Sequence, residues 1–150
     1  MIKKILVPVD GSEHSDRALN FALDLAEKYS AKITLLSVAQ PVVDAGPMLV
    51  TQPMLPPETM PIYVKGIEDA HKRLLSEAFK KAKNAKPNLS ISKMLTDGRP
   101  ADRIVEIAEK ENFDLIVMGS RGAGGIKKFF LGSVSDRVAD EASCPVLLVK

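Results

Sequence analysis

The residues best suited to chemistry in this sequence are glycines and serines near its C-terminal end. Gly119, Gly122, Gly132 and Ser133 follow the spacing Gly-x2-Gly-x9-Gly-Ser, and Ser135 comes two residues later. Glycine lets the backbone approach an anion closely, and the amides at a helix start point toward it. The two serine hydroxyls add further hydrogen-bonding groups. The pattern predicts a phosphate-binding loop that leads into a helix.

Two better-known phosphate motifs do not fit. A P-loop requires a Gly-Lys pair, and the chain has none; the dinucleotide fingerprint requires glycine where Lys127 stands. The alternative interpretation is that these glycines only form a flexible surface turn. Five glycines between positions 119 and 132 are more than one turn requires.

Other reactive side chains offer less. Arg121 lies between the glycines, where a guanidinium can clamp a phosphate, although a solvated loop arginine is the alternative. His14 and His71 lack partners at metal-ligand spacing, so we expect surface histidines. Cys144 has no recognisable basic partner, so we expect a small buried hydrophobe. We identify no catalytic residue, and the metal ligands stay unknown.

Short apolar runs predict the strands that position these groups. The expected strands are residues 5–9, 33–38, 89–95, 115–118 and 145–149, and the expected helices are residues 12–29, 67–85, 100–111 and 133–142. Strands that alternate with helices predict an α/β protein with one open five-stranded parallel sheet and helices on both faces. We expect a single domain over residues 1–150.

The stretch from Gln40 to Pro61 departs from this regularity. It contains six prolines and three methionines. Prolines at this density interrupt any amphipathic helical pattern, so we expect a long loop. Its role, as a cover for the site or a contact for a partner, stays open.

In an open parallel sheet, ligands bind beyond the carboxyl ends of the strands, where the connections reverse direction. This rule selects Pro8, Val9 and Asp10 after the first strand, and Val38 at the end of the second. The valines offer apolar contact and backbone hydrogen bonds to a base edge. Asp10 is suited to accept hydrogen bonds from ribose hydroxyls or to help hold a metal ion. The alternative is that it closes the Asp-Gly turn and caps the helix that follows, and one side chain can do both.

Bulk composition excludes several classes of protein. The chain has 150 residues, a net charge of +2, 45% hydrophobic and 27% charged residues, which is ordinary for one globular domain. The nearly balanced charge argues against a nucleic-acid or membrane-surface partner. No segment reaches the roughly 20 apolar residues of a membrane span. A single cysteine permits no internal disulfide, and we expect a cytoplasmic protein.

Three stretches together resemble the universal stress protein family. They are Ile-Leu-Val-Pro-Val-Asp-Gly-Ser at 5–12, Met-Gly-Ser-Arg-Gly-Ala-Gly-Gly at 118–125, and the segment from Gly-Ser-Val-Ser at 132–135 to Cys-Pro-Val-Leu-Leu-Val at 144–149. The resemblance covers the chain apart from residues 40–61, and the glycine spacing is similar to that of the family's ATP-binding branch. It implies a Rossmann-like sheet of order 3-2-1-4-5, a homodimer, and bound ATP, which we expect with Mg²⁺ or Mn²⁺.

By position, the resemblance divides the site into two groups of residues. Those implied to surround the adenosine are Pro8, Val9, Asp10 and Val38. Those implied to surround the ribose and phosphates are Met118, Gly119, Arg121, Gly122, Gly132, Ser133, Val134 and Ser135.

The sequence favours a regulatory, stress-response ATP-binding protein with at most slow hydrolysis, because no positioned base accompanies the loop. The alternatives are an interaction dimer that is independent of nucleotide and an adenine-nucleotide hydrolase or transferase. In the order 3-2-1-4-5, the apolar strand from Pro145 to Val149 is an edge. Unprotected apolar edges invite another strand, so we expect the homodimer to form there.

Overall fold

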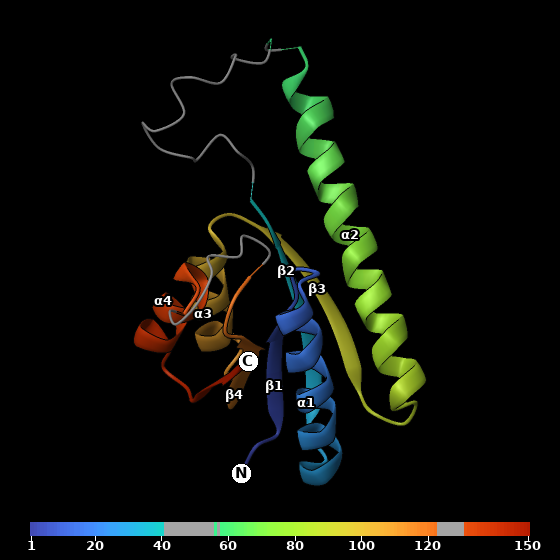
Figure 1. The fold of residues 1–150 in the computed structure, drawn as a ribbon, viewed down its shortest axis with the longest axis vertical. Coiled ribbons are helices and arrows are strands. Elements are labelled where there is room, and N and C mark those ends of the chain that lie inside the picture. The colour runs from blue at the N-terminus through green and yellow to red at the C-terminus, as the bar shows by residue number, and fades with distance from the viewer. Residues whose placement is uncertain (41–55, 57, 123–130) are drawn as a thin grey trace.

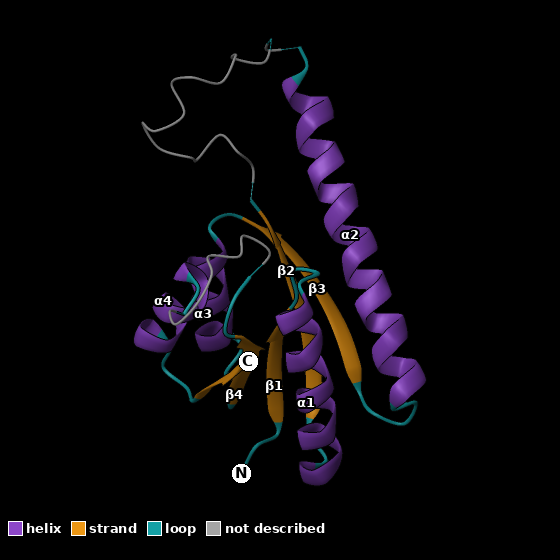
Figure 2. Cartoon of the chain, in the orientation of Figure 1, coloured by secondary structure: helices purple, strands orange, loops and turns teal. Residues whose placement is uncertain are grey.

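The computed structural model describes residues 1–40, 56, 58–122 and 131–150. Helices and strands alternate along the chain (Figure 2). Their order is β1 (Lys4–Pro8), α1 (Glu13–Tyr29), β2 (Lys32–Ala39), α2 (Met60–Ala85), β3 (Ile91–Asp97), α3 (Pro100–Lys110), β4 (Leu115–Gly119), α4 (Ser133–Glu141) and β5 (Val146–Val149). The predicted α/β fold class is confirmed.

All five strands are parallel and form one sheet in the order β3-β2-β1-β4-β5. This is the order that the family resemblance implies. The central strand β1 pairs on one side with β2 and on the other with β4, so that Ile5 lies opposite both Ile33 and Leu115. Helices α1 and α2 pack on one face of the sheet, and α3 and α4 pack on the other (Figure 1).

The core forms two layers because successive side chains of a strand point to opposite faces of the sheet. Ile5 and Val7 of β1 pack toward α1, whereas Leu6 packs toward α3 and α4. All three side chains are fully buried. An unbroken apolar run is therefore needed in β1, since both of its faces are covered by helices.

The turn between β1 and α1 matches the sequence expectation closely. Pro8 is the last residue of β1, and the Val9 amide that follows still donates to the Leu36 carbonyl of β2 at 2.8 Å. Ser12 is the N-cap of α1, and its hydroxyl accepts a hydrogen bond from the Ser15 amide at 3.1 Å. Between them Gly11 has a φ of +80°, a left-handed conformation that favours glycine.

Helix α2 begins earlier than the apolar period predicts. It starts at Met60 rather than near residue 67, and Pro61 lies in its first turn, where a missing amide costs no hydrogen bond. The expectation that the loop includes Pro61 is wrong. This first part of α2 extends beyond the sheet (Figure 1), and Ile62 is 74% exposed, so no apolar face is required there. The rest of the predicted loop, residues 41–55 and 57, lies outside the described residues.

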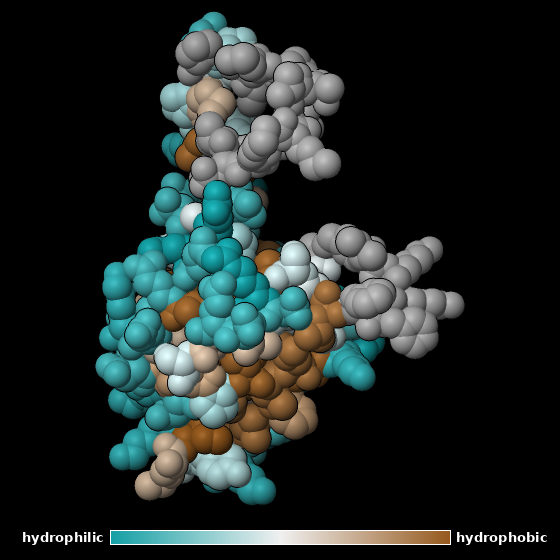
Figure 3. All heavy atoms as spheres, turned by 90° about the vertical axis from the view of Figure 1, so that its left-hand side faces the viewer, coloured by the Kyte–Doolittle hydropathy of each residue, from teal (hydrophilic) through white to brown (hydrophobic). Residues whose placement is uncertain are grey.

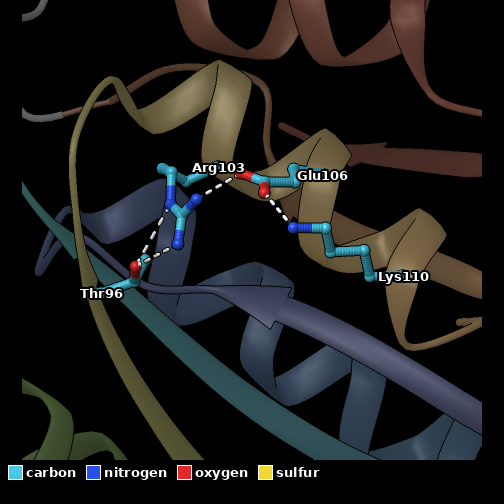
Figure 4. A network of polar contacts seen from close by, with 4 residues as sticks. All are labelled: Thr96, Arg103, Glu106 and Lys110. Atoms are coloured by element: carbon cyan, nitrogen blue, oxygen red, sulfur yellow. Dashed lines mark hydrogen bonds and ion pairs between the residues drawn. The ribbon is translucent and has the colours of Figure 1, made fainter.

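A polar network ties the edge strand β3 to α3 (Figure 4). The Thr96 hydroxyl accepts hydrogen bonds from the Arg103 guanidinium, at 3.2 Å from Nε and 2.9 Å from its second terminal nitrogen. Glu106 in turn pairs with both Arg103 and Lys110. The network holds the start of α3 beside the end of β3. Pro100 is the first residue of that helix, as predicted.

Candidate functional site

A cavity of about 540 Å³ opens at the carboxyl ends of the strands. The twelve residues that the sequence predicts for a binding site all line it: Pro8, Val9, Asp10, Val38, Met118, Gly119, Arg121, Gly122, Gly132, Ser133, Val134 and Ser135. They come from the ends of β1, β2 and β4 and from the start of α4. The structure brings them together, and their role in binding stays a prediction.

The topology explains why these segments meet. The chain leaves β1 toward β2 through α1 and leaves β4 toward β5 through α4, so the connections diverge between β1 and β4. A crevice forms at such a switch point because the two helices cover opposite faces of the sheet. Segments far apart in the sequence thus share one wall of the cavity.

Backbone hydrogen bonds join the two halves of the glycine motif. The Gly132 amide donates to the Ser120 carbonyl at 2.8 Å, and the Ser120 amide donates to the Val149 carbonyl at 2.8 Å. A Cβ on Gly132 would lie 3.3 Å from the Arg121 Cα, which is tighter than ordinary contact. The residues at 119–122 and 132–135 therefore lie side by side, and residues 123–130 of the motif lie outside the described residues.

The two serines of the motif have different surroundings. Ser133 is exposed, whereas Ser135 is buried with 2% of its surface accessible. The Ser135 hydroxyl lies 2.8 Å from the Ser120 carbonyl and 2.9 Å from the Gly132 carbonyl. A hydroxyl has one proton, so donation to a phosphate would compete with these backbone acceptors. The sequence did not reveal this structural role of Ser135.

The starts of α1 and α4 also differ. The Ser12 hydroxyl caps α1, whereas the N-cap of α4 is Gly132, which has no side chain to offer. The first amides of a helix have no acceptor within the helix itself, and they carry its partial positive charge. Because α4 begins at the cavity wall, this helix start is suited to an anion.

Asp10 closes a turn and also faces the glycine motif. Its Oδ1 accepts a hydrogen bond from the Ser12 amide at 2.9 Å, which is the turn-closing role considered for it. Helix capping belongs to Ser12 instead. The other carboxylate oxygen, Oδ2, lies 2.9 Å from the position of a Cβ on Gly122. The two roles considered for Asp10 are therefore compatible, and a role toward a ligand stays a prediction.

Gly119 has a packing role that the sequence did not reveal. It is the buried last residue of β4. A Cβ there would lie 2.8 Å from both the backbone carbonyl carbon and the Cβ of His14 in the first turn of α1. Real Cβ atoms do not approach other atoms this closely, so only glycine lets α1 sit against the end of β4.

Six lining residues were missed by the sequence analysis: Ser15, Leu36, His71, Pro100, Ile104 and Leu131. The expectation of a surface position is wrong for His71, which is half-buried and lies with Nδ1 2.8 Å from the Ser37 hydroxyl. A signal was available, because position 71 falls on the same helical face as Leu74, Leu75 and Ala78. His14 is also half-buried, and within the described ranges its Nδ1 has no hydrogen-bond partner.

Among the described residues that line the cavity, the charged groups are Asp10 and the half-buried Arg121. Within the part of the chain that the structure describes, no three His, Cys, Asp or Glu side chains come together to hold a metal ion.

Cys144 packs beside the core layer of α3 and α4, and burial raises the pKa of its thiol. Cys144 is only half-buried, so the expectation of a buried position is met in part, while the raised pKa disfavours the reactive thiolate.

Fold and site together define an α/β protein with a cavity at its topological switch point. The universal stress protein family model matches residues 1–150. A universal stress protein of Methanocaldococcus jannaschii is 38% identical over 152 residues, covering 100% of this chain and 83% of the relative. A universal stress protein from Thermus aquaticus is 37% identical over 153 residues, and the alignment covers 100% of both chains. The chain belongs to the universal stress protein family.

Solved structures agree with the fold. A universal stress protein from Lactobacillus plantarum superposes with a TM-score of 0.81 at 24% identity, covering 99% of this chain and 97% of that one. A universal stress protein in complex with cAMP gives a TM-score of 0.72 at 26% identity, covering 99% and 97%. One from Archaeoglobus fulgidus in complex with dAMP gives 0.63 at 20% identity, covering 100% and 98%. Relatives in the family thus bind adenine nucleotides.

Among the described residues, no helix is long and apolar enough to cross a bilayer.

Proposed function

We propose that the protein binds ATP, with Mg²⁺ or Mn²⁺, in the cavity at the carboxyl ends of its strands. The observation that carries this proposal is the convergence of the glycine motif, the start of α4 and the end of β1 on one cavity of about 540 Å³. Cavities of roughly 300–1,000 Å³ are typical of small-molecule sites.

The residues present fit a nucleotide from end to end. The phosphates lie toward Gly122, Gly132 and Ser133, where the backbone is unobstructed by side chains and a helix begins. Arg121 supplies positive charge at the same wall. Val9 and Val38 offer apolar surface to the base at the β1 and β2 ends. The complex of a relative with cAMP supports an adenine ligand.

The cavity offers little to hold a metal ion by protein groups alone. Asp10 is the one acidic residue among the described lining residues, so the phosphates themselves would supply most ligands to Mg²⁺. The bound ion would neutralise phosphate charge. Asp10 would accept hydrogen bonds from the ribose hydroxyls or help to hold the ion.

We expect regulation rather than turnover as the role of the bound nucleotide. Hydrolysis requires a group that positions or deprotonates the attacking water. Of the described lining residues, only Asp10 and His71 are candidates, and both side chains already make hydrogen bonds within the protein. Slow hydrolysis is therefore the upper limit of the proposed activity.

Calorimetric titration of Gly122→Val with MgATP tests the site. A branched side chain there enters the space beside Asp10 and the proposed phosphates, since even its Cβ lies 2.9 Å from the carboxylate. We expect a loss of about 1.4 kcal/mol or more, which is tenfold in affinity. Gly66→Val is the matched control, because Gly66 is exposed on α2 with no atom near its Cβ position. Unchanged affinity in a folded Gly122→Val protein contradicts the assignment.

We further propose that residues 1–150 form one domain and that two copies pair through β5. This strand is an edge of the sheet, and its four residues, all apolar, are only partly buried. Hydrophobic side chains gather on the face that lies on the α4 side of Figure 1 (Figure 3). Pairing of β5 with its copy about a two-fold axis would satisfy both edges at once.

A further inference from the structure

A histidine and a buried serine form a polar pair at the wall of the cavity. Ser37 of β2 is fully buried, and its hydroxyl lies 2.8 Å from Nδ1 of His71 on α2. His71 is half-buried and lines the cavity. It is the one described lining residue that α2 contributes. None of the site residues predicted from the sequence belongs to this pair.

The position of α2 assigns His71 to one end of the cavity. Leu75 and Ala82 of α2 pack in the same core layer as Ile33 and Leu35 of β2, so the helix lies over the β2 side of the sheet. The glycine motif and α4 lie on the opposite side of β1. Val38, next to Ser37 in β2, lines the cavity beside this end. His71 therefore stands at the proposed base end, away from the proposed phosphates.

The chemistry of the pair determines which proton His71 presents to the cavity. A serine hydroxyl has one proton, and a buried proton without an acceptor is costly. Within the described ranges, His71 is the partner recorded for the Ser37 side chain. Donation from the hydroxyl to Nδ1 satisfies that proton and makes Nδ1 an acceptor. The imidazole proton then lies on Nε2, the ring nitrogen that is not engaged by β2.

We propose that His71 recognises the base of the nucleotide: its Nε2–H donates to a ring nitrogen of the purine, and Ser37 is the positioning residue that sets the tautomer and orientation of the imidazole. The inference rests on the proposed function, because it assigns a residue within the same cavity. It adds a directional side-chain donor to the end of the site that Val9 and Val38 line.

The test is a comparison of ATP with its 1-deaza, 3-deaza and 7-deaza analogues, each of which replaces one ring nitrogen by C–H. The four ligands are titrated calorimetrically into the unaltered protein, His71→Asn and Lys72→Ala. Asparagine places its amide where Nδ1 lies, which keeps the contact with Ser37 and removes the group at Nε2. Lys72 is the exposed neighbour of His71, and its removal is the matched control.

In the unaltered protein we expect one analogue to bind about tenfold more weakly than ATP. A change of this size corresponds to the loss of one hydrogen bond. His71→Asn should bind ATP about tenfold more weakly and should no longer distinguish that analogue from ATP. Lys72→Ala should behave like the unaltered protein. Equal affinity of all four ligands for the unaltered protein, or unchanged ATP affinity in His71→Asn, overturns the role of His71 while ATP binding itself stands. Absence of ATP binding to the unaltered protein overturns the proposed function and this inference together.

The tautomer is tested without any substitution. Long-range ¹H–¹⁵N correlation spectra of the unaltered protein report which ring nitrogen of His71 carries the proton. We expect protonated Nε2 and acceptor Nδ1, with the Nε2 resonance shifting when ATP is added. A proton on Nδ1 overturns the proposal, because Nε2 would then accept rather than donate. This measurement decides the question even if His71→Asn does not fold.

Discussion

At the scale of single residues, the glycines of the motif serve different purposes. Gly119 allows two backbones to pack, since a Cβ there would lie 2.8 Å from His14 backbone and side-chain atoms. Gly122, in contrast, faces the Asp10 carboxylate across the cavity wall. A glycine required by packing and a glycine that lines the cavity beside a carboxylate are indistinguishable in the sequence.

We predict that Gly119→Ala lowers the free energy of unfolding by about 1–3 kcal/mol, because the added methyl group forces α1 away from β4. Urea denaturation followed by circular dichroism measures the change. Gly66→Ala is the control: in an exposed helical position the same substitution should stabilise by about 0.5–1 kcal/mol. An unchanged unfolding midpoint in Gly119→Ala would show that the helix adjusts freely and that glycine is not needed there.

At the scale of elements, Asp114 connects the start of β1 to the start of β4 by hydrogen bonds. Its Oδ2 accepts hydrogen bonds from the Lys3 amide at 2.8 Å and the Lys4 amide at 2.9 Å, and its own amide donates to the Lys4 carbonyl at 3.0 Å. The backbone donors at Lys3 and then Lys4 hold the pKa of the Asp114 carboxyl below its ordinary value. One side chain thus fixes the register between two adjacent strands.

The depressed pKa of Asp114 predicts a pH-dependent contribution to stability. The carboxylate binds a proton less readily in the folded state than in the unfolded state, so its contribution is complete above the unfolded pKa. The contribution is then lost as the pH falls through the lower folded pKa. Asp114→Asn should therefore be less stable than the unaltered protein at pH 7, and the difference should shrink below about pH 4. Urea denaturation at several pH values measures it, with the exposed Asp140→Asn as control. A difference independent of pH would contradict the assignment.

At the scale of the whole molecule, the two edges of the sheet differ. The β3 edge carries exposed Ser92 and Lys93, whereas β5 consists of Val146, Leu147, Leu148 and Val149. A polar, charged edge discourages pairing with another strand, and an apolar edge invites it. This asymmetry is the physical reason to expect one interface, at β5, rather than open-ended association through both edges.

We predict that the unaltered protein sediments as a dimer at micromolar concentration. Leu148→Lys places a charge in the β5 edge and should give a monomer or insoluble protein, since burying an unpaired ammonium group is costly. Ser92→Lys makes the matched change at the β3 edge and should leave the dimer intact. A monomer at tens of micromolar for the unaltered protein would refute the interface.

Most of the architecture could be predicted from the sequence because its signals are local. Continuous apolar runs indicate strands covered on both faces, and Ser12 and Pro100 mark helix starts by their own chemistry. Predicted strand ends and the glycine motif, together with the family resemblance, then selected twelve residues that line one cavity. Parallel strands make this possible, since their carboxyl ends necessarily share one edge of the sheet.

Only the tertiary structure decided which other residues reach the cavity and which roles the motif residues have. His71 comes to the wall because of how α2 lies across β2, and Ser135 turns its hydroxyl to the Ser120 and Gly132 carbonyls. Gly119 is constrained by a helix that begins more than a hundred residues earlier in the chain. The sequence by itself determined the elements, their order and the glycine-rich edge, because these depend on neighbours along the chain. Contacts between distant elements depend on helix placement and side-chain packing, which no local pattern encodes.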